Sequence, residues 1–331
     1  MSDSIAIIYM GGTFGCIGEP LSPMPAAHFF AQLKQHYPQA DYHFVEAPVI
    51  KDSTELSVAD WLLLAEQIHT LAQQGFQSFI VIHGTDTLAY AGAFLHHFFA
   101  QQYRIVITGS QFPILDVQGQ SLRANSDASE NFNFALAEIK HAEQGVYVAF
   151  NQQLFYANSC YKQHTEDFNA FTGTLSHNHS PTHSLNIAQS FDFSKDNIDN
   201  LIQNLSNVRI DHLYLTPMPA QQLQQQLLQR ISNPETVPSV LFIQGFGSGN
   251  LPYSEQLKTT IQQLIQHHHC QIIISSQVLF GTLSQKYATG SWLSDTAVLF
   301  DTHISQADSF IRAKLLCALH PTDWQTHWDI T

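Results

Sequence analysis

The stretch from Ser78 to Ala100 constrains the fold more than any other part of the chain. An apolar run of strand length, residues 78–82, leads into the polar turn 83–87, and apolar residues at helical spacing follow. The turn is therefore predicted to join a buried strand to a helix. At such corners of a parallel α/β sheet, the helix amino terminus leaves backbone N–H groups free, and ligands bind there.

The side chains of this turn allow two interpretations. Thr85 and Asp86 would place a hydroxyl and a carboxylate at a ligand-binding corner. Alternatively, Asp86 or Thr87 simply caps the helix, which typically stabilises it by about 1 kcal/mol.

The first half of the chain alternates between strand-like and helix-like segments. Strands are expected at 5–9, 42–45, 78–82, 104–107 and 146–150. Helices are expected at 26–36 and 121–140, with another that follows residues 56–61 and ends near residue 74, and a hairpin is expected at 152–161. This alternation predicts a mostly parallel sheet flanked by helices. Four corners with hydroxyl side chains, at Thr13, Ser53, Thr85 and Ser110, would then face the same edge of the sheet, whereas the loop 14–28 should lack regular structure.

The second half is predicted to form a smaller α/β domain. Its expected strands are 213–215, 239–243 and 271–275, and its expected helices are 219–230, 253–267 and 306–319. Between the halves the apolar periodicity is lost. We therefore expect an N-terminal catalytic domain at 1–185, a linker at 186–210 and a C-terminal domain at 211–331.

Composition excludes several classes of partner. The chain has 331 residues and a formal net charge of −14, with only 13 Lys and Arg, so a surface that binds nucleic acid or an anionic membrane is not expected. No segment approaches the ~20 apolar residues of a membrane helix, and the amino terminus does not resemble a signal peptide. The four cysteines form no CxxC pair, so reduced thiols in a cytoplasmic protein are expected.

Two other patterns suggest a bound cofactor, and neither is complete. Glycines 11, 12, 15 and 18 follow a strand, but they lack the GxGxxG spacing and the lysine of a phosphate-binding loop. Histidines at 177, 179 and 183 and at 267–269 have the right ligand type for zinc, but not a spacing that converges on one ion. We therefore expect no nucleotide cofactor and no metal site.

A threonine in a glycine turn is a possible nucleophile if a base removes its proton. No histidine is placed by the sequence to act as that base. Asp86 beside Thr85, with a lysine from elsewhere in the chain, would have to do so. Residue spacing alone does not identify the lysine.

The segments 9–15 (YMGGTFG) and 83–87 (HGTDT) closely resemble the two signature segments of the bacterial-type asparaginases, the asparaginase/glutaminase family. The likeness continues at 52–56, 108–113, 126–131 and 247–250, in family order. The stretch 154–171 is similar to the segment around the catalytic lysine in the cytoplasmic type I branch, and it places Lys162 on that lysine.

The resemblance implies the activity and the residues that perform it. Hydrolysis of L-asparagine to aspartate and ammonia would use Thr13 as the nucleophile, and Thr85, Asp86 and Lys162 as a second triad. The likeness also implies that Ser53, Thr54 and Asp86 hold the substrate's α-carboxylate and α-amine, and we add Ser110 to this binding set. Family members have a larger N-terminal and a smaller C-terminal domain, and they form intimate dimers that often pair into tetramers.

Two positions depart from the family pattern. The mobile lid of the family carries a tyrosine, but here no tyrosine occurs between Tyr9 and Tyr37, and Leu21 or Ser22 aligns with that position. Gln244 replaces an arginine that serves an allosteric asparagine site in some type I enzymes, so hyperbolic kinetics are expected.

Three alternative functions remain open. The chain could favour glutamine over asparagine, or it could be a catalytically weak or silent amino-acid-binding protein of the same fold. It could also be the amidase subunit of a transfer-RNA-dependent amidotransferase, although that family carries an extra N-terminal domain and this chain begins directly at its first strand.

Overall fold

The computed structural model describes residues 4–178, 184–284, 288–301 and 304–328. The chain forms two compact units. The first comprises residues 1–202 together with 304–312, and the second comprises residues 203–303 together with 313–330. Within the described residues, none of the helices is both long and apolar enough to cross a membrane.

A six-stranded sheet forms the centre of the first unit. The order of its strands is β4 (Tyr42–Glu46), β1 (Ile5–Tyr9), β5 (Ser78–Ile82), β6 (Arg104–Thr108), β7 (Gly145–Phe150) and β8 (Gln153–Tyr156). All neighbouring pairs are parallel except β7 and β8. The predicted mostly parallel α/β fold is therefore confirmed, and the carboxyl ends of β4, β1, β5 and β6 lie along one edge of the sheet.

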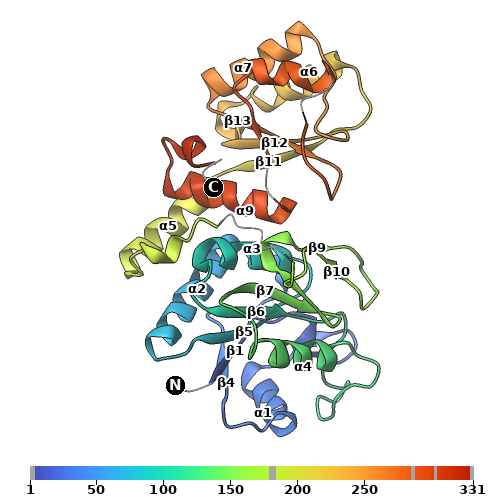
Figure 1. The fold of residues 1–331 in the computed structure, drawn as a ribbon, viewed down its shortest axis with the longest axis vertical. Helices are drawn as coiled ribbons and strands as arrows, with labels where there is room; N and C mark the ends of the chain where they lie inside the picture. Colours follow the sequence, from blue (N-terminus) through green and yellow to red (C-terminus); the bar gives the residue numbers. More distant parts are fainter. Residues whose placement is uncertain (1–3, 179–183, 285–287, 302–303, 329–331) are drawn as a thin grey trace. The chain divides into compact units, whose positions relative to one another are not determined.

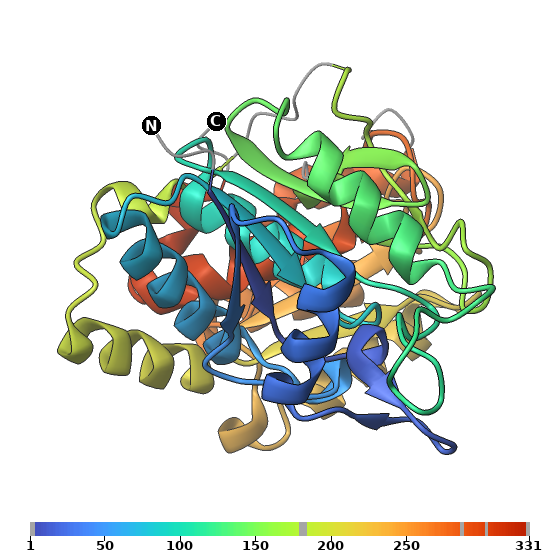
Figure 2. The same ribbon diagram turned by 90° about the horizontal axis from the view of Figure 1, so that it is seen from below.

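Helices cover both faces of this sheet (Figure 1). On one face, α1 (Ala26–His36) and α4 (Ala128–Glu138) pack their aromatic and aliphatic side chains against inward residues of the strands. Both helices lie in front of the sheet in Figure 2. On the other face lie α2 (Val58–Gln73) and α3 (Leu88–Phe99). Because the central strands are buried on both sides, they are apolar throughout rather than alternating.

Three local expectations for the first unit need correction. The helix expected at 121–140 begins only at Ala128, because the Asp127 carboxylate accepts hydrogen bonds from the backbone N–H groups of Gln111 (2.9 Å) and Phe112 (3.0 Å), which ties it to the preceding loop. The hairpin expected within 152–161 instead joins β8 to β7. The loop 14–28 contains a short hairpin of β2 (Cys16–Ile17) and β3 (Ser22–Pro23).

The second unit is built on a four-stranded parallel sheet. Its strand order is β11 (Ile210–Tyr214), β12 (Val240–Gly245), β13 (Gln271–Ser276) and β14 (Leu299–Phe300). Helices α6 (Ala220–Arg230) and α7 (Glu255–His268) pack leucine and isoleucine side chains into its core. The second unit also contains α8 (Ala288–Ser291) and the last part of α9 (Gln306–Leu319), whose first residues belong to the first unit.

The segment expected as a linker, 186–210, contains the helix α5 (Lys195–Asn207). Three apolar side chains at helical spacing, Ile198, Leu201 and Leu205, are buried among otherwise polar residues. One narrow apolar stripe is therefore sufficient to form this helix. The division between the two units falls inside the same segment, between residues 202 and 203.

A buried polar contact fixes the corner that follows β5. His83 is fully buried, and its Nδ1 lies 2.8 Å from the Gly84 carbonyl oxygen, which can only accept a hydrogen bond. The Nδ1 atom therefore carries the proton, and Nε2 accepts the indole N–H of Trp61 on α2 at 3.1 Å. Burial lowers the pKa of His83 to about 4, so the imidazole is neutral at pH 7.

Because His83 is buried in its neutral form, we expect the folded state to lose stability in acid. In the unfolded chain the histidine pKa is about 6.5, so between pH 6.5 and 4 the unfolded state binds a proton that the folded state excludes. The stabilisation is complete above pH 6.5 and falls by about 3 kcal/mol as the pH approaches 4. The variant His83→Asn retains a donor for the Gly84 carbonyl but does not titrate, so its urea midpoint should fall less than that of the wild type over this range.

The exposed His267 on α7 provides a matched control. His267→Asn should leave the pH dependence of the urea midpoint unchanged. Equal slopes for His83→Asn and the wild type would contradict a neutral buried imidazole.

Candidate functional site

The corners after β1, β4 and β5 meet in the folded chain. A Cβ placed on Gly12 would lie 2.4 Å from the Gly84 Cα, and a Cβ placed on Gly84 would lie 2.5 Å from the Ser53 hydroxyl oxygen. Gly12 also has a φ of 81°, which a residue with a side chain rarely adopts. Glycine at these two positions therefore allows the backbones before Thr13 and Thr85 to touch.

Thr13 lies four residues after the end of β1 and begins a short 3-10 turn, Thr13–Gly15. Its side chain is partly exposed, whereas Phe14 next to it is buried against Phe29 and Phe132. In the part of the chain that the structure describes, the Thr13 hydroxyl makes no hydrogen bond to another residue. The hydroxyl is thus accessible, and the neighbouring aromatic side chain anchors the turn that carries it.

Lys162 contacts two polar side chains of the corner after β5, Thr85 and Asp86, although it lies 77 residues from Thr85 in the sequence. Its Nζ donates to the Thr85 hydroxyl oxygen at 2.8 Å and to an Asp86 carboxylate oxygen at 2.6 Å. Thr85 is buried, whereas the Asp86 side chain is 53% exposed and that of Lys162 is 21% exposed. The contact therefore opens to solvent on the Asp86 side.

The helix-capping interpretation of this turn is not borne out by the geometry. Thr87 precedes the first residue of α3, but its side chain does not cap the helix. Its hydroxyl donates instead to the Ser53 carbonyl at 2.7 Å. Asp86 is engaged by Lys162, so both side chains join elements that are far apart in the sequence.

The segment that carries Lys162 is held from two sides within the first unit. Lys162 lies in β9 (Tyr161–Lys162), which pairs with β10 (Phe171–Thr172) in a short antiparallel ladder. The Tyr161 hydroxyl donates to the Ile304 carbonyl at 2.9 Å, and the Ser305 hydroxyl donates to the Asn158 carbonyl at 2.7 Å. Residues just before α9 therefore restrain β9 and the segment that precedes it.

The four residues predicted to bind substrate have different environments. Ser53 is buried against Gly84, as described above. Thr54 is exposed, and its hydroxyl donates to the Asp52 carboxylate at 2.7 Å. Ser110 is buried, and its hydroxyl donates to the Phe112 carbonyl at 2.5 Å. Asp86 supplies the carboxylate of this set, and its side chain is open to solvent.

Sequence reasoning missed two groups at this corner. Gln111 lies 3.5 Å from the Thr85 hydroxyl through its Oε1, and its Nε2 approaches the carbonyls of His164 and Asp167 at 3.4 Å. His83 holds the Gly84 carbonyl. Because a trans peptide directs its N–H opposite to its carbonyl, the Thr85 N–H points away from His83, and no described residue accepts from it.

No set of metal ligands gathers at this corner among the described residues. Of the histidines considered from the sequence, His179 and His183 lie outside the described residues. A cavity of about 690 Å³ lies elsewhere, near the amino ends of β6 and β7, where Gln102, Gly145 and Tyr147 line it. None of the candidate site residues lines that cavity, so we place the functional site at the corner and not in the cavity.

The comparisons with known proteins identify relatives by sequence and by fold. The family profile described as "Asparaginase, N-terminal" matches residues 4–193. The L-asparaginase of Dirofilaria immitis is 28% identical over 278 residues, which cover 78% of this chain and 42% of that protein. L-asparaginase 1 of Escherichia coli K12 is 29% identical over 176 residues, which cover 51% of this chain and 50% of that protein. The matches thus span about half the length of these curated relatives.

The fold has close counterparts among solved structures. The crystal structure of L-asparaginase I from Vibrio cholerae superimposes with a TM-score of 0.75 at 19% identity, covering 100% of this chain and 98% of that one. At this identity the likeness supports the two-domain α/β fold. The family profile covers more than half of the chain and includes the corners at Thr13, Ser53, Thr85 and Ser110 together with Lys162. This chain therefore belongs to the asparaginase family.

Proposed function

We propose that this protein is an L-asparagine amidohydrolase that acts through a threonine acyl-enzyme. The observation that carries the proposal is the position of the Lys162 Nζ, 2.8 Å from the Thr85 hydroxyl and 2.6 Å from the Asp86 carboxylate. A carboxamide is a poor electrophile with a poor leaving group. Its hydrolysis requires an activated nucleophile, a stabilised oxyanion and a proton for the departing ammonia.

Thr13 is the proposed nucleophile. Its hydroxyl oxygen attacks the side-chain carbonyl carbon of asparagine, ammonia leaves, and an ester with the Thr13 side chain remains. Water then hydrolyses this ester to release aspartate. The turn that carries Thr13 is anchored by Phe14, which is buried in the core, while the threonine side chain stays partly exposed.

Lys162, Thr85 and Asp86 form the proposed proton-transfer group. In its amine form Lys162 accepts the hydroxyl proton of Thr85, which in turn takes a proton from the attacking group. The same relay then returns this proton to the amide nitrogen, which leaves as ammonia. Asp86 stabilises the resulting ammonium ion at 2.6 Å. On this account the lysine acts through Thr85 because Thr85 is the hydroxyl that it contacts.

The Thr85 N–H is the proposed oxyanion donor. His83 fixes the orientation of the peptide between Gly84 and Thr85 by binding its carbonyl from the protein interior, and Trp61 fixes the imidazole in turn. A donor that is oriented before the reaction loses little energy to reorganisation. Removal of one such donor typically costs about 3 kcal/mol of transition-state stabilisation.

Substrate recognition is proposed to depend on Asp86, Ser53 and Thr54. The exposed Asp86 carboxylate attracts the α-ammonium group of the amino acid, and Ser53 and Thr54 receive its α-carboxylate. Ser110 supports the corner after β6 through its bond to the Phe112 carbonyl. A homodimer or homotetramer and a cytoplasmic location remain predictions of the family resemblance.

Replacement of the proposed nucleophile is the first test. Thr13→Ala should lower ammonia release from asparagine by at least about a thousandfold, since loss of a nucleophile removes the covalent route. Thr13→Ser should retain part of the activity. The control is Thr70→Ala, which alters an exposed threonine on α2 and should leave ammonia release unchanged.

Parallel assays separate the alternatives. Faster ammonia release from glutamine would favour a glutaminase, and asparagine binding without ammonia release would favour a silent binding protein. A Thr13→Ala enzyme that keeps wild-type turnover would refute the assignment of the nucleophile.

The missing lid tyrosine leads to a second test. Leu21 lies between β2 and β3, and 48% of its surface is exposed, so this position accepts a larger side chain without disturbing the core. Leu21→Tyr should raise the acylation rate by about tenfold, the equivalent of one additional hydrogen bond. Single-turnover measurements with asparagine report this rate. Leu21→Phe supplies the ring without the hydroxyl and should give no such gain, and an unchanged rate for Leu21→Tyr would count against this view of the lid.

A further inference from the structure

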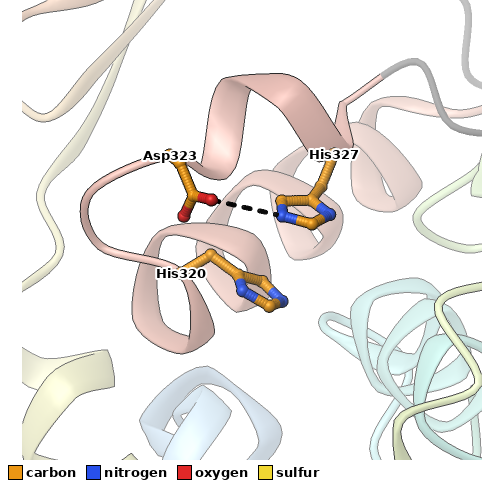
Figure 3. Close-up of side chains that lie close together, drawn as sticks. All are labelled: His320, Asp323 and His327. Atoms are coloured by element: carbon orange, nitrogen blue, oxygen red, sulfur yellow. Dashed lines mark ion pairs between the residues drawn. The ribbon is translucent and has the colours of Figure 1, made fainter.

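A cluster of three potential metal ligands lies just beyond α9 in the second unit. His320 follows the last residue of that helix, and Asp323 and His327 come three and seven residues later, the latter at the end of the 3-10 turn Trp324–His327. Backbone bonds from the N–H groups of residues 323 and 324 to the His320 carbonyl, at 3.3 and 2.9 Å, fold the segment back on itself. Figure 3 shows the three side chains on one side of this fold.

The donor atoms of these side chains are close together. One ligand atom from each residue lies within 4.8 Å of the other two. The His327 Nε2 is 3.8 Å from an Asp323 carboxylate oxygen, and the rings of His320 and His327 stack at 4.2 Å between centroids. Among the described residues, no other set of three His, Cys, Asp or Glu side chains meets this criterion.

To bind one ion, the side chains must rotate so that their donor atoms move closer together and point at a common centre. Ligands at 2.0–2.1 Å from a tetrahedral zinc ion lie about 3.3 Å from one another, which is closer than the present separations. Asp323 is exposed and the two histidines are partly exposed, so their side chains can rotate without disturbing the core. An ion held by all three would leave a fourth position open to water.

The backbone beneath the cluster is held by two tryptophans. Trp324 and Trp328 are buried, and their ring centroids lie 6.2 Å apart. The Trp328 indole N–H donates to the Phe300 carbonyl at 3.0 Å. The segment that carries the ligands is therefore already ordered. An ion would need to orient only side chains, which reduces the entropic cost of binding.

The chemistry of the donors selects the class of ion. Two imidazole nitrogens and one carboxylate suit zinc and similar divalent transition metals, whereas Mg²⁺ and Ca²⁺ prefer sites made of oxygen ligands. We propose that His320, Asp323 and His327 form a binding site for a divalent transition-metal ion, with Zn²⁺ as the representative ion. The site shares no residue with the proposed catalytic corner, and it departs from the expectation that the chain has no metal site.

Calorimetry on the full chain tests this site. The protein carries no polyhistidine tag, is treated with a chelator and is then titrated with ZnCl₂. We expect one ion per chain, at least a hundredfold weaker binding in the double variant His320→Ala/His327→Ala, and about tenfold weaker binding in Asp323→Asn. Co²⁺ in place of Zn²⁺ should give the visible absorption of a site with nitrogen ligands, which the double variant should lack.

The run of histidines at the end of α7 provides the matched control. His267→Ala/His268→Ala removes two histidines that belong to no such cluster, and it should bind Zn²⁺ as the wild type does. Absence of Zn²⁺ binding by the wild type would overturn the proposal. Unchanged binding by the His320→Ala/His327→Ala variant, or loss of binding in the α7 control, would also overturn it.

Discussion

The two contacts of the Lys162 Nζ join the short β9 strand to the corner after β5, and the arrangement of the candidate site depends on them. Both are short, at 2.8 Å to Thr85 and 2.6 Å to Asp86. The Asp86 side chain is more than half exposed, so this ion pair contributes little to folding stability. Its importance is geometric, because it accompanies the contact of the Lys162 amine with the Thr85 hydroxyl, 77 residues away in the sequence.

Close packing of glycines brings the remaining groups to the same place. Parallel strands direct their carboxyl ends to one edge, but side chains would keep the turns at that edge apart. Gly12 and Gly84 remove this obstacle, and the Ser53 side chain packs directly on Gly84. From beneath, the neutral His83 fixes the peptide whose N–H belongs to Thr85. Rigid backbone thus surrounds a small number of partly exposed functional groups.

The sheet and its corners could be predicted from sequence because the strands are buried on both faces and therefore appear as short apolar runs. Lys162 could not be identified from its neighbours, since β9 has only two residues and shows no periodicity. It was found through family resemblance. The direction of the His83 side chain was also unpredictable, because its partner Trp61 comes from a different helix.

Other features were missed because their signals are weak or unusual. Helix α5 relies on one apolar stripe within a polar segment, so that segment was interpreted as a linker. The start of α4 is shifted because Asp127 binds the loop after β6. His320, Asp323 and His327 approach one another only because a tight turn follows α9, whereas their spacing in the sequence matches no common ligand motif.

A double-mutant cycle on Thr85 and Lys162 tests the central claim most directly. Thr85→Val and Lys162→Met are measured separately and together, by kcat/KM for ammonia release from asparagine. If the two side chains act as one proton-transfer group, each single change should cost at least about a hundredfold, and the double variant should be little worse than either one. Losses that multiply in the double variant would show that the two residues act independently, and they would contradict the account.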